Sequence, residues 1–466
     1  MSSDIDTSYQ GLFNLHSTYS QQNQRMLDAL NGVREKNGEK LEKLQSGGTD
    51  ENGSENGHAG LISGPRANLF QNFIEMLEEF MTNAGLNREA QYNYDENGKP
   101  VSYFGSDGND EVRGYNNFMA AGGDGDDDIQ GYDYLFALGG IGNDRISGYS
   151  NTSASGGEGD DRIDGYDNLS AYGGSGNDRI SGYNNTTGYG GSGDDVIDGY
   201  DNLRANGGSG NDRISGYDNL QAVGGAGDDI IDAYDNAVID AGSGDDHISV
   251  YSNASIIAGE GNDRISATGK NNSVDGGAGD DRIKGGKNAK IAGGDGNDLI
   301  SSGMNAIVDG GTGDDRIAVA QNAIVSGGAG DDYVRVGSNS TILYNKGDGM
   351  DVMDASIALS ESTIQFGPDV TPADLNIEKR GEHLVINIGD KGDALVLRGG
   401  AGGDLPTLSF EDGTMVEGSD VLASATVNDS PPDERLTRAL EIEGPGNPLS
   451  LTSNTLPKDR MVNLSV

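Results

Sequence analysis

One spacing dominates this chain: an aspartate that ends an Asn-Asp or Asp-Asp pair returns every 17 residues, apart from one step of 18 between Asp263 and Asp281. A further, degenerate copy of the repeat follows at residues 347–351. A regular repeat of this length predicts a solenoid, because each repeat can bury its apolar residues only against its neighbours. The fourteen members of the aspartate series are Asp110, Asp127, Asp144, Asp161, Asp178, Asp195, Asp212, Asp229, Asp246, Asp263, Asp281, Asp298, Asp315 and Asp332.

Each repeat contains two short segments with the pattern of a strand. Two residues after each aspartate stands Ile or Val between mostly polar neighbours, as at Ile180. In the second segment two positions exchange volume along the chain, from Leu169 with Ala171 to Ala237 with Ile239. A closely packed thin core requires such compensation, whereas a disordered acidic tract does not. We therefore predict an all-β fold, a parallel β-solenoid or β-roll of about 14 turns over residues 101–351.

The composition limits what the chain can bind. Lys and Arg number 31 against 76 Asp and Glu, the formal net charge is -45, and hydrophobic residues make up 33%. This balance argues against nucleic acid and anionic membrane surfaces and favours cations. The absence of Cys excludes disulfides and thiolate metal sites. The sequence contains neither the pattern of a cleaved N-terminal signal peptide nor an apolar run long enough for a membrane-spanning helix.

The glycine-rich segment before each aspartate has the properties of a calcium loop. Gly173, Gly174 and Gly176 allow positive φ and leave backbone carbonyl groups uncovered, and Asp178 supplies a carboxylate at the end of the turn. Ca²⁺ takes six to eight oxygen ligands and accepts carbonyl and carboxylate oxygens together. One loop offers too few, but two loops stacked one turn apart offer enough. Adjacent aspartates about 5 Å apart repel one another without metal, so we expect the chain to fold on binding calcium.

These loops resemble the repeats-in-toxin (RTX) nonapeptide G-G-x-G-x-D-x-U-x, where U is large and apolar, over roughly residues 105–351. The resemblance implies Ca²⁺ between stacked loops, with the fourteen aspartates as ligands. Fourteen loops leave thirteen gaps, so up to about thirteen ions could bind in one row. The second half of each repeat has eight residues and lacks G-G-x-G, unlike the family pattern. We therefore predict calcium at one edge of the solenoid only.

Two further columns follow the same period. Asparagine recurs between the two strands of nearly every repeat, with Tyr134 as the exception, and we interpret it as structural, bonding along the axis and to turn backbone. Tyrosine recurs from Tyr115 to Tyr251 and then gives way to glycine, as at Gly286. We favour a tyrosine ladder that packs on itself; the alternative is a stripe that stacks on sugar rings or on a host partner.

The flanking regions differ from the repeats. Residues 1–100 contain an apolar helical pattern from Phe70 to Met81 and a weaker one over residues 26–44, joined by a Gly- and Ser-containing linker at residues 46–60. We expect this N-terminal region to be partly helical. The predicted helices would pack on each other, cap the first turn of the solenoid, or bind a partner.

The C-terminal region divides into two expected parts. Residues 352–422, with short alternating segments at 362–367 and 410–414, resemble the domain that often follows RTX repeats and predict a β-rich cap that closes the open sheet edge. Residues 423–466 predict a flexible tail. For that tail the family resemblance implies an uncleaved C-terminal signal for a type I ABC-transporter export system; the alternative is an ordinary disordered tail.

No enzyme signature is present. The sequence lacks G-x-S-x-G, H-E-x-x-H and a P-loop, and its four histidines are scattered. The leading hypothesis is a non-enzymatic, secreted, extracellular calcium-binding protein in cell-surface, matrix or host interaction. One alternative is a secreted effector or elicitor delivered through an N-terminal signal. Another is a carbohydrate-binding or carbohydrate-active protein that uses the tyrosine column.

Overall fold

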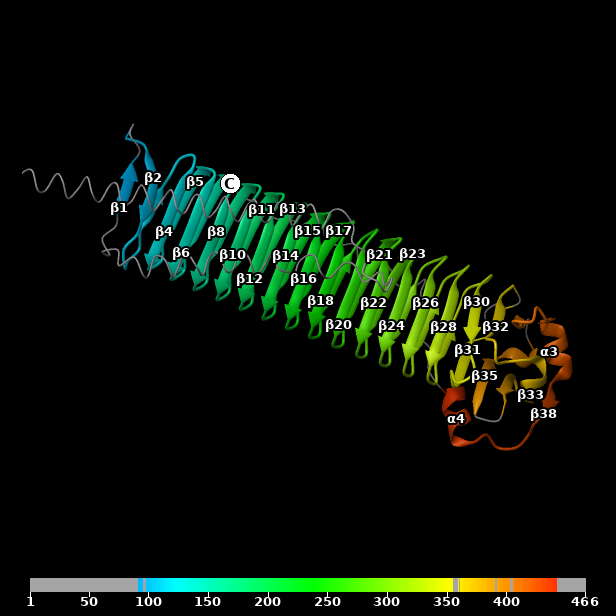
Figure 1. Ribbon diagram of the computed structural model, residues 1–466. Helices are drawn as coiled ribbons and strands as arrows, with labels where there is room; N and C mark the ends of the chain where they lie inside the picture. Colours follow the sequence, from blue (N-terminus) through cyan, green and yellow to red (C-terminus); the bar gives the residue numbers. More distant parts are fainter. Residues whose placement is uncertain are drawn as a thin grey trace, which may run out of the picture. The chain divides into compact units, whose positions relative to one another are not determined.

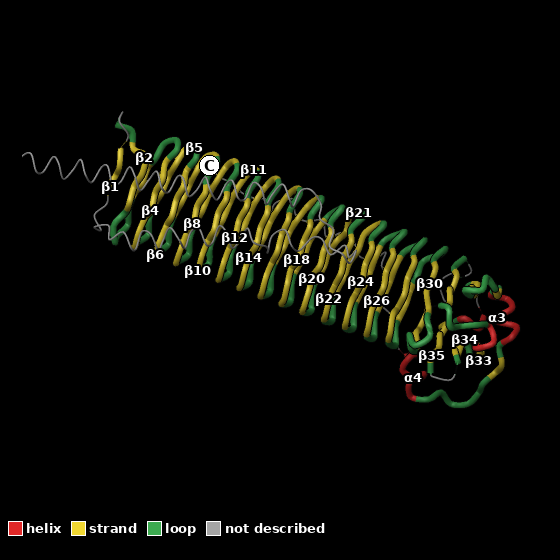
Figure 2. Tube along the Cα trace, viewed as in Figure 1, coloured by secondary structure: helices red, strands yellow, loops and turns green. Residues whose placement is uncertain are grey.

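The computed structural model describes residues 91–94, 98–354, 359, 361–389, 392–402 and 405–441, all within the unit His58–Val466. Nearly all of these residues form strands and the tight turns between them, and the helices gather at the C-terminal end (Figure 2). The helices predicted between residues 26 and 81, the linker at 46–60 and the terminal residues 442–466 lie outside the described residues.

The repeats form a parallel β-solenoid of about 15 turns, which confirms the predicted fold class (Figure 1). Each turn gives one strand to each of two sheets, here named sheet A and sheet B. Sheet A contains, in spatial order, β1 (Gln91–Tyr94), β2 (Pro100–Phe104), β4 (Phe118–Asp124), β6 (Leu135–Ile141), β8 (Ser153–Glu158), β10 (Ser170–Ser175), β12 (Thr187–Ser192), β14 (Arg204–Ser209), β16 (Gln221–Ala226), β18 (Val238–Ser243), β20 (Ser255–Glu260), β22 (Ser273–Ala278), β24 (Lys290–Asp295), β26 (Ile307–Thr312), β28 (Ile324–Ala329), β30 (Thr341–Tyr344), β32 (Thr363–Phe366), β36 (Thr407–Ser409) and β37 (Met415–Val416).

Sheet B contains the strands that carry the isoleucine column and then continues into the C-terminal region. In spatial order these are β3 (Glu111–Arg113), β5 (Asp128–Asp133), β7 (Arg145–Ser150), β9 (Arg162–Asp167), β11 (Arg179–Asn184), β13 (Val196–Asp201), β15 (Arg213–Asp218), β17 (Ile230–Asp235), β19 (His247–Val250), β21 (Arg264–Lys270), β23 (Arg282–Lys287), β25 (Leu299–Ser302), β27 (Arg316–Val319), β29 (Tyr333–Arg335), β31 (Met350–Asp354), β35 (Asp393–Arg398), β34 (His383–Ile388), β33 (Leu375–Arg380) and β38 (Thr426–Val427).

The strands pair in parallel with equivalent positions side by side. Ile180 pairs with Ile197 in sheet B, and Ala171 pairs with Gly188 in sheet A. Because the register equals one repeat, every position of the repeat becomes a column of side chains along the solenoid axis. This is why a single position in the sequence can create a continuous physical feature.

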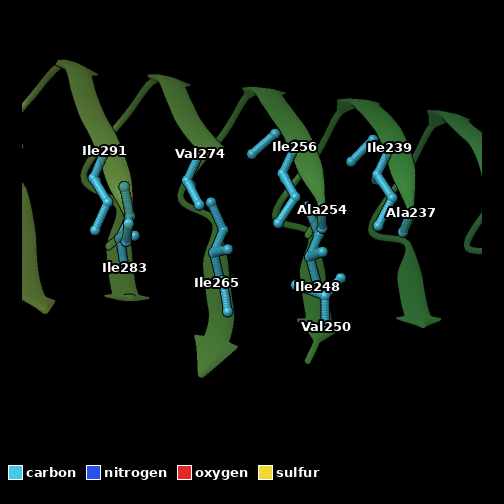
Figure 3. Packing of buried hydrophobic residues seen from close by; sticks show 14 of the residues in the cluster. Ala237, Ile239, Ile248, Val250, Ala254, Ile256, Ile265, Val274, Ile283 and Ile291 are labelled. Carbon is cyan, nitrogen blue, oxygen red and sulfur yellow. The ribbon is translucent and has the colours of Figure 1, made fainter. Parts of the chain in front are cut away.

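The core is the thin layer between the two sheets. Ile180 and its equivalents are buried, and so are both members of the exchanging pairs, such as Leu169 with Ala171 and Ala237 with Ile239. Figure 3 shows part of this layer, where Ile239 and Ile256 of sheet A meet Ile248 and Ile265 of sheet B between the strands. The predicted volume compensation is confirmed.

A third position takes part in that compensation and was not predicted. A Cβ on Gly165 would come within 2.9 Å of the Leu169 side chain. Where alanine replaces that leucine, at Ala254, the third position holds the buried Val250 instead. The third position is therefore larger where its nearest neighbour in the second segment is smaller, so the space beside that neighbour is filled.

The 18-residue step is absorbed without disturbing the aspartate series. The register of β21 on β23 shifts between Ala267 and Lys270, which places the extra residue in a bulge of sheet B. The hydrogen bond that links Asp263 to Asp281 keeps its usual length of 2.8 Å. The insertion therefore lies at the edge opposite the glycine-rich loops.

The two ends of the described solenoid are built differently. At the N-terminal end β1 pairs antiparallel with β2, and the Tyr92 ring packs on Tyr103 with ring centroids 4.6 Å apart. At the C-terminal end antiparallel hairpins continue both sheets, with β35, β34 and β33 on sheet B and β36 and β37 on sheet A. Two short 3₁₀ helices, η2 (Pro372–Asp374) and η3 (Gly400–Gly402), lie within this region.

The stretch expected to be a flexible tail is partly folded. Helix α3 (Gly418–Ser424) crosses the expected boundary at residue 422, and helix α4 (Glu434–Glu441) buries Leu436 and Ala439 against a cluster that includes Met350 and Val352. The reason is the three-residue spacing of Leu436 and Ala439, which places both on one helix face. These helices have 7 and 8 residues, and no helix in the described part of the chain is long and apolar enough to cross a membrane.

Candidate metal centre

The glycine-rich loops have one repeated backbone conformation. The second and fourth residues of every loop from Gly122 onward have positive φ, for example 127° at Gly174 and 117° at Gly176, which L side chains rarely adopt. The first glycine, Gly173, does not have positive φ, and its position holds Ala241 and Ala258 in two later turns. What marks Gly173 is its closeness to two oxygen atoms. A Cβ at Gly173 would lie 2.2 Å from Oδ2 of Asp178 and 2.6 Å from the carbonyl oxygen of Gly190 in the next turn.

The loops stack so that the aspartates of the series stand in a single file. The backbone N–H of each aspartate donates a hydrogen bond to Oδ1 of the aspartate one turn later. Asp161 donates to Asp178 over 2.8 Å, and Asp178 donates to Asp195 over 2.7 Å. The structure thus brings all fourteen predicted residues into one column at one edge, and the carboxylates are part of the contact between turns.

The second carboxylate oxygen of these aspartates, Oδ2, takes no part in the hydrogen bonds between turns. Oδ2 is buried and has no hydrogen-bond partner in thirteen aspartates of the described solenoid, namely Asp127, Asp144, Asp161, Asp178, Asp195, Asp212, Asp229, Asp246, Asp263, Asp281, Asp298, Asp315 and Asp332. Burying a polar atom without a partner is costly, and for a charged group the cost is larger. An unsatisfied oxygen repeated in thirteen successive turns therefore indicates a ligand that the protein chain does not itself supply.

The surroundings of that oxygen fit a hard cation. Oδ2 of Asp178 and the carbonyl oxygen of Gly190 both face the space beside the Cα of Gly173, because a Cβ there would meet both. Two acceptor oxygens approach this space and no donor separates them. Ca²⁺ binds carboxylate and carbonyl oxygens in flexible arrangements. The residues present therefore fit the predicted ion.

Burial changes the acidity of the column. It raises the pKa of Asp178 and Asp315 from the ordinary value of 3.8 to about 8, against the opposing effect of the hydrogen bond from the preceding turn. It raises the pKa of Asp144, Asp161 and Asp195 to about 7. Neighbouring carboxylates raise these pKa values further. Near neutral pH each group therefore needs either a proton or a cation.

Side chains alone do not complete a site. Among the described residues no group of three or more His, Cys, Asp or Glu side chains converges on one point. The column is a file of single carboxylates one turn apart, so most of the ligands of any bound ion would be backbone carbonyl groups. The glycines make this possible, since they leave those carbonyl groups uncovered.

The two ends of the column differ from its middle. Oδ2 of Asp110 is occupied, because it accepts hydrogen bonds from the backbone N–H and the hydroxyl of Ser106 at 2.7 and 3.1 Å. At the other end Oδ1 of Asp351 accepts the N–H of Asp332 at 3.2 Å, and burial raises the pKa of Asp351 well above its ordinary value. The degenerate copy at residues 347–351 thus adds a fifteenth aspartate to the column.

A second ladder beside the first was missed in the sequence. The residue before each aspartate is Asn or Asp, and its Oδ1 accepts the N–H of its equivalent in the next turn, as from Asn177 to Asp160 and from Asp194 to Asn177, both at 2.7 Å. Either Asn or Asp can stand here because both carry this acceptor. That shared property is the signal in the sequence from which the ladder could have been predicted.

The opposite edge is self-sufficient. Its asparagines have φ between 50° and 59°, the left-handed conformation that Asn tolerates. Nδ2 of Asn185 donates to Oδ1 of Asn168 at 3.2 Å, and Nδ2 of Asn202 donates to Oδ1 of Asn185 at 3.1 Å. The structural interpretation of this column is confirmed.

The tyrosines beside the asparagines stack on one another. Ring centroids are 5.0 to 5.2 Å apart from Tyr132 to Tyr251, with interplanar angles of at most 13°. The predicted ladder is confirmed. Because the rings lie face to face, those inside the stack present their edges and hydroxyl groups, rather than their faces, to solvent.

Comparison with known families gives an independent match to these loops. The RTX calcium-binding nonapeptide repeat matches residues 150–168, 170–186, 204–219, 257–289 and 321–343. A search of curated proteins finds no match. The matched segments fall in both the first and the second half of the solenoid and include loops of the aspartate file. The chain therefore contains RTX calcium-binding repeats, and these repeats indicate that it binds Ca²⁺.

Proposed function

We propose that the chain is an exported calcium-binding protein whose solenoid folds outside the cell. The fourteen aspartates from Asp110 to Asp332 would hold up to about thirteen Ca²⁺ ions in one row between the stacked loops. The observation that carries the proposal is the file of buried Oδ2 atoms, each without a hydrogen-bond partner. Bound Ca²⁺ supplies the positive charge that lets these carboxylates stay ionised while buried.

The charge of the chain supports coupling between folding and calcium. With a net charge of -45, the chain repels itself when compact. Thirteen divalent ions would add about +26 and offset more than half of that charge. Inside a cell, where free calcium is scarce, the chain would stay unfolded and suited to export; external calcium would then fold it.

The proposal divides the chain into four parts. Residues 1–100 form the N-terminal region, 101–351 the calcium-binding solenoid, 352–422 the RTX-associated β-rich cap, and 423–466 a tail with the export signal. Hairpins that end both sheets support the role of the cap, because they cover strand edges that would otherwise be free to pair. The folded helix α4 moves the start of any flexible tail beyond residue 441.

The place of action in this proposal is the cell surface, the surrounding matrix or a host, without catalysis. The export partner would be a type I ABC transporter that recognises the C-terminal tail. Deleting residues 442–466 should abolish export, whereas deleting residues 1–57 should leave it unchanged. The opposite result would favour delivery through an N-terminal signal.

A calcium titration of the full chain tests the central claim. Far-UV circular dichroism should change from a disordered to a β-sheet spectrum as Ca²⁺ is added and should reverse with EGTA. Equilibrium dialysis should give a stoichiometry near the number of gaps between loops. A spectrum that does not respond to Ca²⁺ would contradict the proposal.

A further inference from the structure

Several departures from the regular repeat coincide at one place on the asparagine edge. The single 18-residue step of the aspartate series puts its bulge between Ala267 and Lys270 in β21. The stack of tyrosines ends at Tyr251, one turn before that bulge. In repeat proteins, insertions on one face often mark the binding face, and bulges re-aim side chains.

Lysine is concentrated at the same place. Between residues 101 and 351 the chain contains five lysines, and four of them are Lys270, Lys284, Lys287 and Lys290. Here they are named the lysine patch. They belong to the neighbouring strands β21 and β23 and to β24, which follows β23 across the turn at Asn288 (Figure 1). The column that holds Asp218 and Asp235 in earlier turns holds Lys270 and Lys287 here. Its charge therefore changes from negative to positive.

The strand register brings these lysines together. Lys270 pairs directly with Lys287, so their backbones are about 5 Å apart. Lys284 lies between Ser266 and Ser301, and Lys290 lies between Ser273 and Ile307. None of the four has an acidic residue at the paired position on a neighbouring strand.

Nothing in the described structure neutralises the patch. No carboxylate of the described residues lies within ion-pair distance of its four ammonium groups, although arginines elsewhere on sheet B do form such pairs, as Arg179 does with Asp198 at 2.6 Å. Lys270, Lys287 and Lys290 are exposed. Like charges placed opposite each other on adjacent strands are destabilising.

The bulge that presents Lys270 is held firmly. Asn272 is buried, and its Nδ2 donates to the carbonyl oxygens of Tyr251 and Ala267 at 2.9 and 3.0 Å. Its Oδ1 accepts the N–H of Ala254 at 2.9 Å. The buried amide thus replaces an apolar core residue in order to fix this irregular turn. The backbone at Lys270 therefore has a conformation that buried hydrogen bonds define.

We propose that the lysine patch is the docking site for a linear anionic polysaccharide, recognised through its sulfate or carboxylate groups. This inference deepens the proposed surface or matrix role and rests on it for the folded, calcium-bound state. Charge complementarity selects the partner. The patch is narrow and is surrounded by an acidic protein, so a single thin chain can follow it.

Broader polyanions fit less well. A nucleic-acid duplex or an anionic bilayer would also face the acidic residues that the same column carries in earlier turns, Asp201, Asp218 and Asp235. Charges within about 10 Å of one another are only partly screened at moderate ionic strength. Such partners would therefore meet repulsion on the N-terminal side of the patch, whereas a thin chain that stays on the patch would not.

The test compares two variants of the full chain in saturating Ca²⁺. One replaces the four patch lysines by glutamine. The matched control replaces Arg145, Arg162, Arg204 and Arg213 by glutamine, which removes the same positive charge from strands far from the patch. Binding to a linear sulfated dextran, a linear polyuronate and a neutral dextran is measured by calorimetry at low ionic strength. Circular dichroism establishes that each variant is folded.

We expect the wild-type chain and the arginine control to bind one or both anionic polymers, and the lysine variant to lose at least about tenfold in affinity. The two anionic polymers distinguish sulfate from carboxylate recognition. A folded wild-type chain that binds neither polymer, or equal losses in both variants, would overturn the inference. A chain that stays unfolded in Ca²⁺ would instead contradict the proposed function.

Discussion

The two edges of the solenoid use different chemical groups to hold successive turns together. Both must hold successive turns one strand spacing apart, and both do so with a column of short polar side chains. At the asparagine edge, amide groups donate and accept within the column, as from Asn202 to Asn185. At the loop edge, each carboxylate satisfies one oxygen and leaves Oδ2 without a partner.

The difference teaches that one solenoid can combine a column whose hydrogen bonds are complete with a column that needs a proton or an ion from the solution. Neutral amides carry their own donors, so the asparagine column needs no further component. Carboxylates have only acceptors, so the loop edge requires a proton or a cation. Under the proposed function, dependence on calcium is therefore a property of one edge and not of the fold as a whole.

The largest expected effect concerns pH in calcium-free solution. Burial raises the pKa of the loop aspartates above the ordinary value of 3.8, to about 7 at Asp195 and about 8 at Asp178. The folded state then binds more protons than the unfolded state, so its stability is greatest near and below pH 4 and is lost as pH rises towards 7 to 8. A series of circular dichroism spectra in EGTA should show β structure at acid pH and its loss near neutrality. Stability that rises over this range would contradict the asymmetry between the edges.

Asp195→Asn should have effects of opposite sign with and without calcium. In Ca²⁺ the variant loses a carboxylate at a buried site, with an expected cost of about 3 kcal/mol. Without Ca²⁺ the new amide would stand where Oδ2 now faces the carbonyl oxygen of Gly207, and could donate to it without taking up a proton. Once the pH is high enough to ionise the wild-type carboxyl group, this difference should be worth about 1 kcal/mol to the variant. Urea unfolding in Ca²⁺, and in EGTA at about pH 6, measures both effects. A change of the same sign in both conditions would argue against metal at this edge.

Asn202→Ala should weaken the other edge equally in both conditions. Asn202 has φ 55°, and alanine in this conformation costs about 1–2 kcal/mol. The variant also loses the bond to Asn185, while Asn202→Gly loses that bond but tolerates the backbone. The glycine variant should therefore be the less destabilised of the two. A calcium-dependent effect of either variant would show that the edges are coupled.

The smallest expected effect is that of Tyr200→Ala. Tyr200 stacks between Tyr183 and Tyr217 with centroids 5.0 Å from each, and its side chain is partly exposed. Loss of the stacking should cost about 1 kcal/mol in urea unfolding, independently of calcium. Tyr115→Ala is the matched control, because Tyr115 is 68% exposed and lies before the stacked series. Equal effects at the two positions would mean that stacking adds nothing.

Much of the fold followed from the period alone. Because equivalent positions pair in register, a 17-residue repeat specified which residues form each column, and the alternation at Ile180 specified which face is buried. The exchange of volume between positions such as Leu169 and Ala171 predicted the thin core from the sequence. The α4 helix was not foreseen, since its Leu436 and Ala439 gain their burial from Met350 and Val352, which are distant in sequence.

The candidate site was predictable in its members but not in its chemistry. Asp178 was identified by its place in the repeat, yet only the stacked turns show that its Oδ1 is used and its Oδ2 is not. The role of Gly173 also changed, from conformational freedom to room for a carboxylate and a carbonyl group. Such facts depend on atoms from two turns, which no single repeat contains.

By itself, the sequence determined the period, the identity of the columns and the acidic loop edge, because these are properties of spacing and residue type. Only the tertiary structure decided which oxygen stays unpaired, where the inserted residue near Lys270 goes, and that α4 packs on the last turns. The physical reason is that hydrogen bonding and burial are settled between neighbouring turns. A repeat acquires them only when it is stacked against the next one.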